Sequence, residues 1–473
     1  MNNSNIQIHF CGGNATEVTG SCIHIKTPHR QILLECGLVQ SNDVMTDYLR
    51  NGESFPFVPK QIDYVFCNHT HVDHIGRVPL LYSRGCKASV IIPENSSDIM
   101  LSLLYDCAKI ALADAKTISG IHHKRYEAIY RYHDVVSVVP RLHEYGFHTV
   151  YRLDDYVSFM FIPAGHIMNS AQLVLWITEE GKTTKILYTS DLGNEHVKKP
   201  FVDPFEPVTD ADIVIGESTY GNTLTIADDE MRNNELSQLR HILTEVSRQG
   251  GSVLIPTFAN SRAQELLTLI YQMFGKDTSF KTSLVLDTAL GTEISHIYCD
   301  VLEGEDQRMF EKAFNWSRLM VPYDERGPFL RDNKHIRHPL IVLASSGMLS
   351  FGPAKGWCKK VISDKKCAIV FCGFTPEETL GSEVKDPSVS KVRIDGIEFK
   401  KQAKIYDFHS FSSHMQRDSL IDYYSTIDTP KVVLVHGDPE AKQSLMEAIR
   451  NRRQETGNSA EIICAEGNLV IDL

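Results

Sequence analysis

The chain has 473 residues, of which 42% are hydrophobic and 23% are charged, and its formal net charge at pH 7 is −12. This length exceeds what one ordinary hydrophobic core holds, so we expect two domains or one domain with a large insertion. The sequence shows no membrane-spanning segment and no secretory signal, and the negative charge argues against nonspecific electrostatic binding of nucleic acid.

Eleven cysteines are scattered along the chain, and none of them forms a CxxC pair. An odd number of dispersed cysteines is typical of free thiols in a reducing compartment, and it indicates neither a disulfide framework nor a cysteine zinc site. We therefore expect a cytoplasmic location without membrane attachment.

Short apolar runs separated by turns open the chain, at residues 6–10, 22–25 and 32–34. Their period-two or continuous apolar character predicts strands of a sheet that is buried on at least one face. A further predicted strand, residues 63–68, runs directly into a group of histidines. We expect these histidines to lie on a loop at the carboxyl end of the strand, where catalytic groups are often found.

The middle of the chain begins with a helical pattern over residues 97–131. Strands are predicted at residues 158–162, 171–177, 185–188 and 211–215. These strands have the same pattern of short apolar runs as the first part of the chain, so we assign them to the same domain.

A second α/β unit is indicated between about residues 222 and 384, where helices and strands alternate as they do around a parallel sheet. After it, apolar runs at residues 404–406 and 432–436 resemble those of the first part. We therefore interpret the second unit as an insertion. The predicted division is residues 1–216 and 385–473 for the first domain and residues 217–384 for the inserted one.

The histidine group is the segment His69-Thr70-His71-Val72-Asp73-His74. His69 and His71 lie two residues apart, so both imidazoles can face one position, whereas Asp73 and His74 in the following turn can reach a second one. Three imidazoles and a carboxylate suit zinc better than calcium or magnesium. Four such groups after a buried strand bring no structural benefit, which favours a metal site.

Three further candidates end apolar strands in the same way, and they are His166, Asp191 and His436. Each one alone could be a surface histidine or a capping aspartate. Together with the histidine group they make seven candidate ligands, enough for two metal ions.

Several motifs occur in one order along nearly the whole chain. They are His69-Thr70-His71-Val72-Asp73-His74, Glu217-Ser218-Thr219-Tyr220-Gly221, Arg262-Ala263-Gln264-Glu265, Ser345-Ser346-Gly347-Met348-Leu349, Phe411-Ser412-Ser413-His414 and Val435-His436-Gly437. This order resembles the β-CASP branch of the metallo-β-lactamase superfamily, nucleases that include the pre-mRNA 3′-end cleavage endonuclease and RNase J. The resemblance implies an α/β fold, a metallo-β-lactamase αββα sandwich with an inserted parallel-sheet β-CASP domain.

The resemblance also implies two Zn²⁺ ions per chain. The implied ligands are His69, His71 and His166 for the first ion, Asp73, His74 and His436 for the second, and Asp191 for both. A hydroxide held between two such ions is a nucleophile at neutral pH, and the ions neutralise charge on the attacked phosphate.

A departing ribose oxygen needs a proton that metal ions do not supply. In the family pattern Glu217 and His414 lie beside the leaving group, and a histidine oriented by a carboxylate suits a general acid. We therefore expect Asp73, Glu217 and His414 to be catalytic, with His414 as the general acid of a zinc-dependent ribonuclease.

Three alternatives from other classes remain. A small-molecule metallo-hydrolase on the same fold would need neither the insertion nor the pair of Glu217 and His414. A DNA nuclease of the Artemis type resembles the chain in its insertion but typically carries valine where this chain has His436, which favours RNA. A scaffold subunit without activity is disfavoured because all seven ligand positions are filled.

Substrate contacts are expected from Arg262, Ser345 and Ser346, which could bind RNA phosphates through a guanidinium, hydroxyls and backbone N–H groups. A structural arginine and a strand-to-helix turn explain these residues equally well. The expected partner is single-stranded RNA, with a protein partner or a second copy of the chain as a further contributor. One departure from the family pattern is Glu35, which stands where relatives usually carry aspartate and could rearrange the support of the histidine loop.

Overall fold

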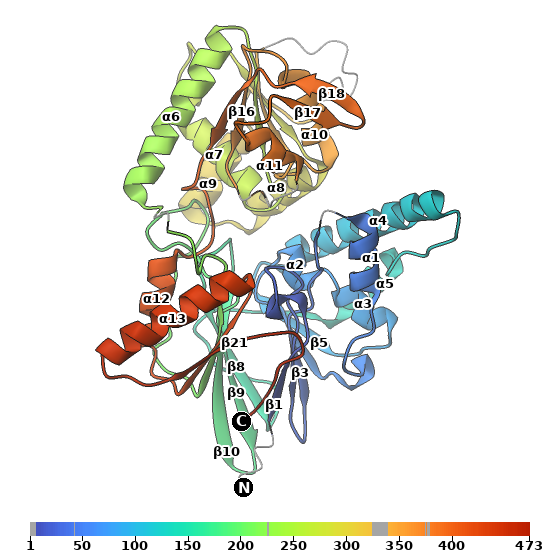
Figure 1. Ribbon diagram of the computed structural model, residues 1–473, viewed down its shortest axis with the longest axis vertical. Coiled ribbons are helices and arrows are strands. Elements are labelled where there is room, and N and C mark those ends of the chain that lie inside the picture. The colour runs from blue at the N-terminus through green and yellow to red at the C-terminus, as the bar shows by residue number, and fades with distance from the viewer. Residues whose placement is uncertain (1–5, 42, 225–226, 324–338, 374, 376–378) are drawn as a thin grey trace. The chain divides into compact units, whose positions relative to one another are not determined.

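The computed structural model describes residues 6–41, 43–224, 227–323, 339–373, 375 and 379–473 (Figure 1). The chain forms two compact units. The first comprises Met1–Glu195, Val202–Ile226 and Ser413–Leu473, and the second comprises His196–Phe201 and Ala227–Ser412. Within the described residues, no helix combines the length and the apolar character needed to cross a bilayer.

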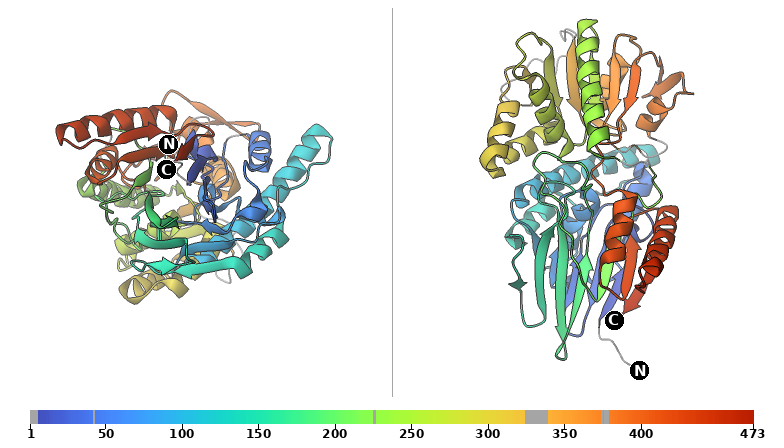
Figure 2. Two further views of the ribbon diagram at one scale, coloured as in Figure 1. Left: turned by 90° about the horizontal axis from the view of Figure 1, so that it is seen from below. Right: turned by 90° about the vertical axis from the view of Figure 1, so that its left-hand side faces the viewer.

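Two sheets form the centre of the first unit (Figure 1, Figure 2). In spatial order, the described strands of the first sheet are β22 (Val470–Asp472), β1 (Gln7–Phe10), β2 (Ile23–Lys26), β3 (Gln31–Leu34), β4 (Tyr64–Phe66), β5 (Ser89–Pro93) and β6 (Leu142–Tyr145). Those of the second are β21 (Glu461–Cys464), β20 (Lys431–Val435), β11 (Ile213–Glu217), β10 (Lys182–Tyr188), β9 (Ala171–Glu179), β8 (Val157–Pro163) and β7 (Tyr151–Arg152).

The main core of this unit lies between the two sheets. Ile8 and Phe66 of the first sheet and Phe159, Leu173 and Ile215 of the second belong to one cluster, and all five are fully buried. The apolar residues of each strand therefore alternate toward a shared interior, as the sequence pattern predicted.

Helices cover the outer faces of the two sheets. On the first sheet they are α1 (Val44–Gly52), α3 (Val78–Ser83), α4 (Ser97–His122) and α5 (Tyr132–Val138), as Figure 1 shows. On the second they are α12 (Arg417–Thr426) and α13 (Pro439–Glu455), which bury Leu420 and Leu445 in a cluster with Val214 and Leu434. This arrangement confirms the αββα sandwich that the resemblance implied.

The second unit is built on a parallel sheet. In spatial order, its described strands are β14 (Leu319–Met320), β13 (Ser283–Asp287), β15 (Leu340–Ala344), β12 (Val253–Pro256), β16 (Ala368–Phe371) and β19 (Lys404–Asp407). All the neighbours in this order pair in parallel. The helices are α6 (Asp229–Arg248), α7 (Arg262–Phe274), α8 (Ala289–Val301), α9 (Gly304–Phe314), α10 (Gly352–Val361) and α11 (Leu380–Lys385), and β17 (Lys391–Ile394) pairs with β18 (Ile397–Lys400) as a separate hairpin. Central strands such as β12 and β15 are buried at every position, as expected for a sheet covered on both faces.

Two features of the chain differ from the sequence-based expectation. β19 pairs with β16, so the chain up to Ser412 belongs to the second unit, whereas the sequence pattern predicts the apolar run at residues 404–406 in the first domain. A short edge strand carries too little pattern to reveal its sheet. The helix predicted over residues 97–131 ends at His122, because His123 adopts a left-handed backbone with φ of 49°.

Candidate metal centre

The candidate ligands follow strands whose carboxyl ends lie at one edge of each sheet. β8, β10, β11 and β20 run in the same direction, and β4 runs parallel to its neighbours β3 and β5. The loop after β4 leads through His69 and His71 into α2 (Val72–Ile75). Loops that leave parallel strands on the same side can therefore bring distant residues together.

Two glycines allow these loops to approach each other closely. A Cβ at Gly193 would lie 1.7 Å from the carbonyl oxygen of Gly165, next to His166. A Cβ at Gly37 would lie 1.6 Å from the carbonyl oxygen of Asp73. Only glycine fits at either position, so both residues are part of how the sequence assembles the site.

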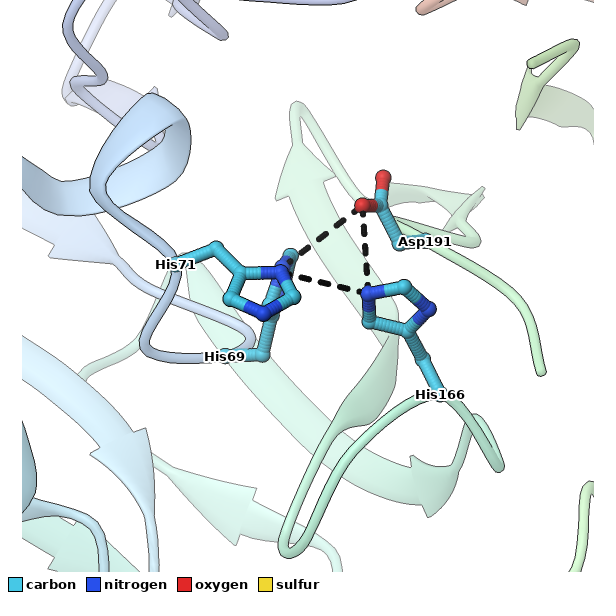
Figure 3. A group of neighbouring side chains, drawn as sticks. All are labelled: His69, His71, His166 and Asp191. Carbon is cyan, nitrogen blue, oxygen red and sulfur yellow. Dashed lines mark hydrogen bonds and ion pairs between the residues drawn. The ribbon is translucent and has the colours of Figure 1, made fainter. Parts of the chain in front are cut away.

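The first group of ligand atoms comes from His69, His71, His166 and Asp191, which point toward one another in Figure 3. His71 Nδ1 lies 3.2 Å from both His69 Nε2 and His166 Nε2. Asp191 Oδ2 lies 3.6 Å from the same two Nε2 atoms. Three imidazole nitrogens and one carboxylate oxygen therefore converge within 4.8 Å, a donor set that suits zinc.

The second group consists of Asp73, His74 and His436. Asp73 Oδ2 lies 3.4 Å from His74 Nε2 and 3.5 Å from His436 Nε2. Asp191 Oδ2, already near the first group, is also 3.4 Å from His74 Nε2. The structure thus brings all seven candidates together, with one Asp191 oxygen next to ligands of both groups.

The chemistry of this cluster fits a metal ion. His74 Nε2 is buried and accepts or donates no hydrogen bond among the described residues, although the Asp73 and Asp191 carboxylates face it. A buried imidazole nitrogen aimed at carboxylate oxygens without a hydrogen bond is expected where a cation binds between them.

Burial sets the protonation of three of the imidazoles. It lowers the pKa of His69 and His166 well below the usual value and that of His71 to about 4. These side chains are therefore neutral near pH 7. Neutral imidazole is the form that binds a metal ion.

The remaining ligands are controlled by neighbouring charges. Burial disfavours the charged form of His74, but the carboxylates of Glu35, Asp191 and Asp73 raise its pKa well above the usual value. Burial likewise opposes ionisation of Asp73 and Asp191, yet histidines that include His74 and His436 lower both pKa values well below the usual range. Both carboxylates are thus ionised at neutral pH and available to a cation.

Glu217 and His414 form a pair beside the first group. Glu217 Oε1 lies 3.3 Å from His414 Nδ1 and accepts a hydrogen bond from the backbone N–H of Leu192, while Oε2 accepts one from the N–H of Thr219. The carboxylate is 1% exposed and the His414 side chain 22% exposed. The centre of the His414 ring is 4.5 Å from that of His166. A held carboxylate therefore orients a partly accessible imidazole next to the candidate ligands.

Sequence reasoning missed most of the residues that orient the ligands. Glu35 Oε2 accepts hydrogen bonds from His74 Nδ1 and from the Tyr188 hydroxyl, both at 2.5 Å, and Oε1 accepts one from the Ser190 hydroxyl at 2.8 Å. Ser190 Oγ is also 3.2 Å from His69 Nδ1. The sequence signal that could have identified Tyr188 is its position at the end of the strand that leads to Asp191.

Comparisons with known proteins identify the family. Two family models match the chain, the Beta-Casp domain over residues 263–384 and the Zn-dependent metallo-hydrolase RNA specificity domain over residues 399–463. Over 452 residues the chain is 31% identical to a ribonuclease of Thermus thermophilus, an alignment that covers 94% of this chain and 96% of that protein. The chain belongs to the β-CASP branch of the metallo-β-lactamase superfamily.

Similarity at lower identity extends over the same length. An RNase J-like protein of Methanocaldococcus jannaschii is 28% identical, with 94% of this chain and 95% of that protein covered. Cleavage and polyadenylation specificity factor 73 of Drosophila melanogaster is 24% identical, with 95% of this chain and 62% of that protein covered. A crystal structure of a protein of unknown function from Enterococcus faecalis shares the fold, with a TM-score of 0.55, 11% identity and coverage of 99% of this chain and 100% of that one.

The three predicted substrate contacts lie in the second unit, which contains the Beta-Casp match. Arg262 is 7% exposed, and its guanidinium forms an ion pair with Glu265. Ser345 and Ser346 follow β15, and their carbonyl oxygens accept hydrogen bonds from the N–H groups of Ala354 and Leu349. The Arg262 guanidinium and the backbone of the two serines thus have partners within the second unit, and their contact with RNA phosphates stays a prediction.

Proposed function

We propose that this β-CASP protein is a two-zinc ribonuclease that hydrolyses RNA phosphodiester bonds. The observation that carries the proposal is the convergence of seven imidazole and carboxylate ligand candidates beside the pair of Glu217 and His414. Divalent ions bound by these ligands supply an activated water at neutral pH and offset the charge of the phosphate. A mixed set of imidazole and carboxylate donors favours zinc.

His414 is the proposed general acid for the departing ribose oxygen. Glu217 faces Nδ1 of the ring, so the carboxylate orients the imidazole and leaves Nε2 as the atom that would deliver the proton. Because Glu217 is itself held by two backbone N–H groups, the orientation of the His414 ring is set before substrate binds.

RNA is the proposed substrate for two reasons. Two relatives whose alignments cover 94% of this chain are named as a ribonuclease and an RNase J-like protein. This chain also has His436, where DNA nucleases of the Artemis type typically carry valine. Its Nε2 lies 3.5 Å from Asp73 Oδ2, and its Nδ1 lies 3.3 Å from Asp191 Oδ1.

The proposal is tested by cleavage of end-labelled and internally labelled single-stranded RNA and DNA in the presence of zinc. We expect RNA to be cut faster than DNA. The Asp191→Ala variant should lose cleavage and bind less zinc, because Asp191 lies next to ligands of both groups. Asp155→Ala, which removes an exposed carboxylate of the same unit, serves as the control. Faster cleavage of DNA would refute RNA as the preferred substrate. Full activity of Asp191→Ala would refute the proposed metal site.

The role of His414 is tested by changing the leaving group. His414→Ala should slow RNA cleavage by about 10²- to 10⁴-fold, the usual contribution of general acid catalysis, without changing zinc content. Hydrolysis of bis(p-nitrophenyl) phosphate should slow far less, because p-nitrophenolate departs without a proton. Equal losses on both substrates would contradict a role in protonating the leaving group.

A further inference from the structure

Positive charge is concentrated in one segment of the second unit. Residues 352–404 contain eleven lysines and arginines but seven aspartates and glutamates, a net charge of +4 in a chain whose net charge is −12. Such an asymmetry is unexpected for a solvated surface in an acidic protein. It indicates a local surface for an anionic partner.

The hairpin of β17 and β18 presents part of this charge on one face. In the strand register of the hairpin, Arg393 lies opposite Glu398, and Lys391 lies opposite Lys400. The intervening Val392 is 1% exposed. Because side chains alternate between the faces of a strand, packing of the apolar face holds the charged face toward solvent.

The turn after α10 adds further cations next to the hairpin, as the positions of α10, β17 and β18 in Figure 1 show. The Ser363 hydroxyl donates a hydrogen bond of 2.8 Å to the carbonyl oxygen of Lys400. The N–H of Lys404 donates one of 3.0 Å to the carbonyl oxygen of Cys367. The backbone of residues 363–367, which includes Lys365 and Lys366, is therefore fixed beside Lys400 and Lys404.

Five of these cations have their charge free for a partner. We call them the basic edge, and they are Lys365, Lys366, Arg393, Lys400 and Lys404. All five are exposed, and within the described part of the chain none of their side chains forms an ion pair or a hydrogen bond.

Neighbouring lysines are different, because they are already neutralised. Lys391 is paired with Glu398 at 2.6 Å, and both Lys355 and Lys359 are paired with Asp395. Asp395 and Glu398 thus form their ion pairs with other lysines. Glu398 lies opposite Arg393 in the hairpin and Glu245 feels the charge of Lys404, but neither carboxylate forms an ion pair with the basic edge.

We propose that the basic edge binds the phosphate backbone of RNA and holds the substrate on the second unit. The five cations match a polyanion in sign and in number, and exposed lysines and arginines on a strand and a turn contact phosphates without reading bases. The identity of the polyanion as RNA rests on the proposed function. Binding at the basic edge does not require the metal ligands, which belong to the first unit.

The test is the affinity of the full chain for a fluorescent single-stranded RNA of mixed sequence, measured by anisotropy with EDTA present so that no cleavage occurs. The variant changes Lys365, Lys366, Arg393, Lys400 and Lys404 to glutamine. We expect its affinity to fall about ten-fold or more, and the slope of log K against log salt to decrease by about 0.7 for each lost phosphate contact.

A matched control removes the same charge elsewhere. It changes four exposed lysines and one exposed arginine to glutamine, namely Lys109, Lys116, Lys276, Arg308 and Lys312. This control should retain the wild-type affinity and salt slope. A second variant that replaces Arg393 by lysine and the four lysines by arginine keeps the charge and should also bind RNA normally, which separates charge from folding.

The outcomes separate this inference from the proposed function. Equal loss in the test and control variants, or no loss in the test variant, would overturn the basic edge as an RNA site. Binding of polyglutamate in preference to RNA would overturn it in favour of an acidic protein partner. A third outcome is that RNA binding depends on the basic edge but the wild-type protein cleaves no RNA with zinc. That result would support this inference and refute the proposed function.

Discussion

Glu35 links three segments of the candidate metal centre through one carboxylate. It is fully buried, its backbone is left-handed with φ of 61°, and it accepts hydrogen bonds from His74, Tyr188 and Ser190. Compared with the aspartate usual in the family, glutamate adds a methylene, and in this structure the longer side chain reaches His74 directly. A histidine that donates its second nitrogen to a carboxylate is held in one tautomer and is a better metal ligand.

Replacing Glu35 by glutamine should weaken zinc binding by about 10- to 100-fold, the usual effect of removing such support. The single carbonyl oxygen of glutamine cannot accept hydrogen bonds from His74 and both hydroxyls together. Zinc affinity is measured by competition with a chromophoric chelator. Glu179→Gln is the control, because Glu179 is another buried carboxylate of the same unit and lies 2.6 Å from His29 Nδ1. Unchanged zinc affinity in Glu35→Gln would show that the carboxylate does not position His74.

At the scale of elements, the segment His196–Phe201 belongs to the second unit although the chain on both sides of it belongs to the first. Phe201 packs against Tyr298 and Phe310. Lys199 is 8% exposed, and burial lowers its pKa to about 7 near the charges of Glu265, Arg262 and Arg232. No motif marks this segment, because its role depends on residues about one hundred positions away.

Stability should therefore depend on pH through Lys199. Between its folded pKa of about 7 and the unfolded value of about 10.4, the unfolded chain binds more protons, so the free energy of unfolding rises with pH. The rise from about pH 7 to about pH 9 should be on the order of 2 kcal/mol. It should disappear in Lys199→Met and persist in Lys198→Met, where the replaced lysine is exposed. Denaturant titrations of the three proteins at both pH values measure the difference, and an identical pH dependence in Lys199→Met would contradict the assignment.

At the scale of the whole molecule, all seven ligand candidates and the pair of Glu217 and His414 belong to the first unit, although Asp191 and His436 are separated in the chain by the entire insertion. The second unit has its own parallel sheet and its own core around Leu254 and Val342. Metal binding and the basic edge are thus assigned to different units.

Removal of metal should loosen the first unit selectively. A ligand present at 100 times its dissociation constant stabilises the native state by about 2.7 kcal/mol per site, and chelation removes that contribution. Hydrogen exchange followed by mass spectrometry should show faster exchange in β10 and β11 after EDTA treatment, with β12 and β15 unchanged. The Asp191→Ala variant should show the faster exchange already without EDTA. Equal acceleration in β12 and β15 would contradict a metal centre confined to the first unit.

Local patterns in the sequence predict the buried strands, the inserted α/β unit and the residue types of the candidate site, and the resemblance to a known family implies the αββα sandwich. Buried strands require apolar runs, and a metal ion requires imidazoles and carboxylates at strand ends, so both leave local patterns such as His69 to His74. The hydrogen bonds that orient the ligands and the boundaries of the two units depend on tertiary contacts. Glu35 and Tyr188 are 153 residues apart, and β16 and β19 join through backbone hydrogen bonds that any sequence can make. Contacts between distant segments depend on how elements pack, which periodicity and spacing do not encode.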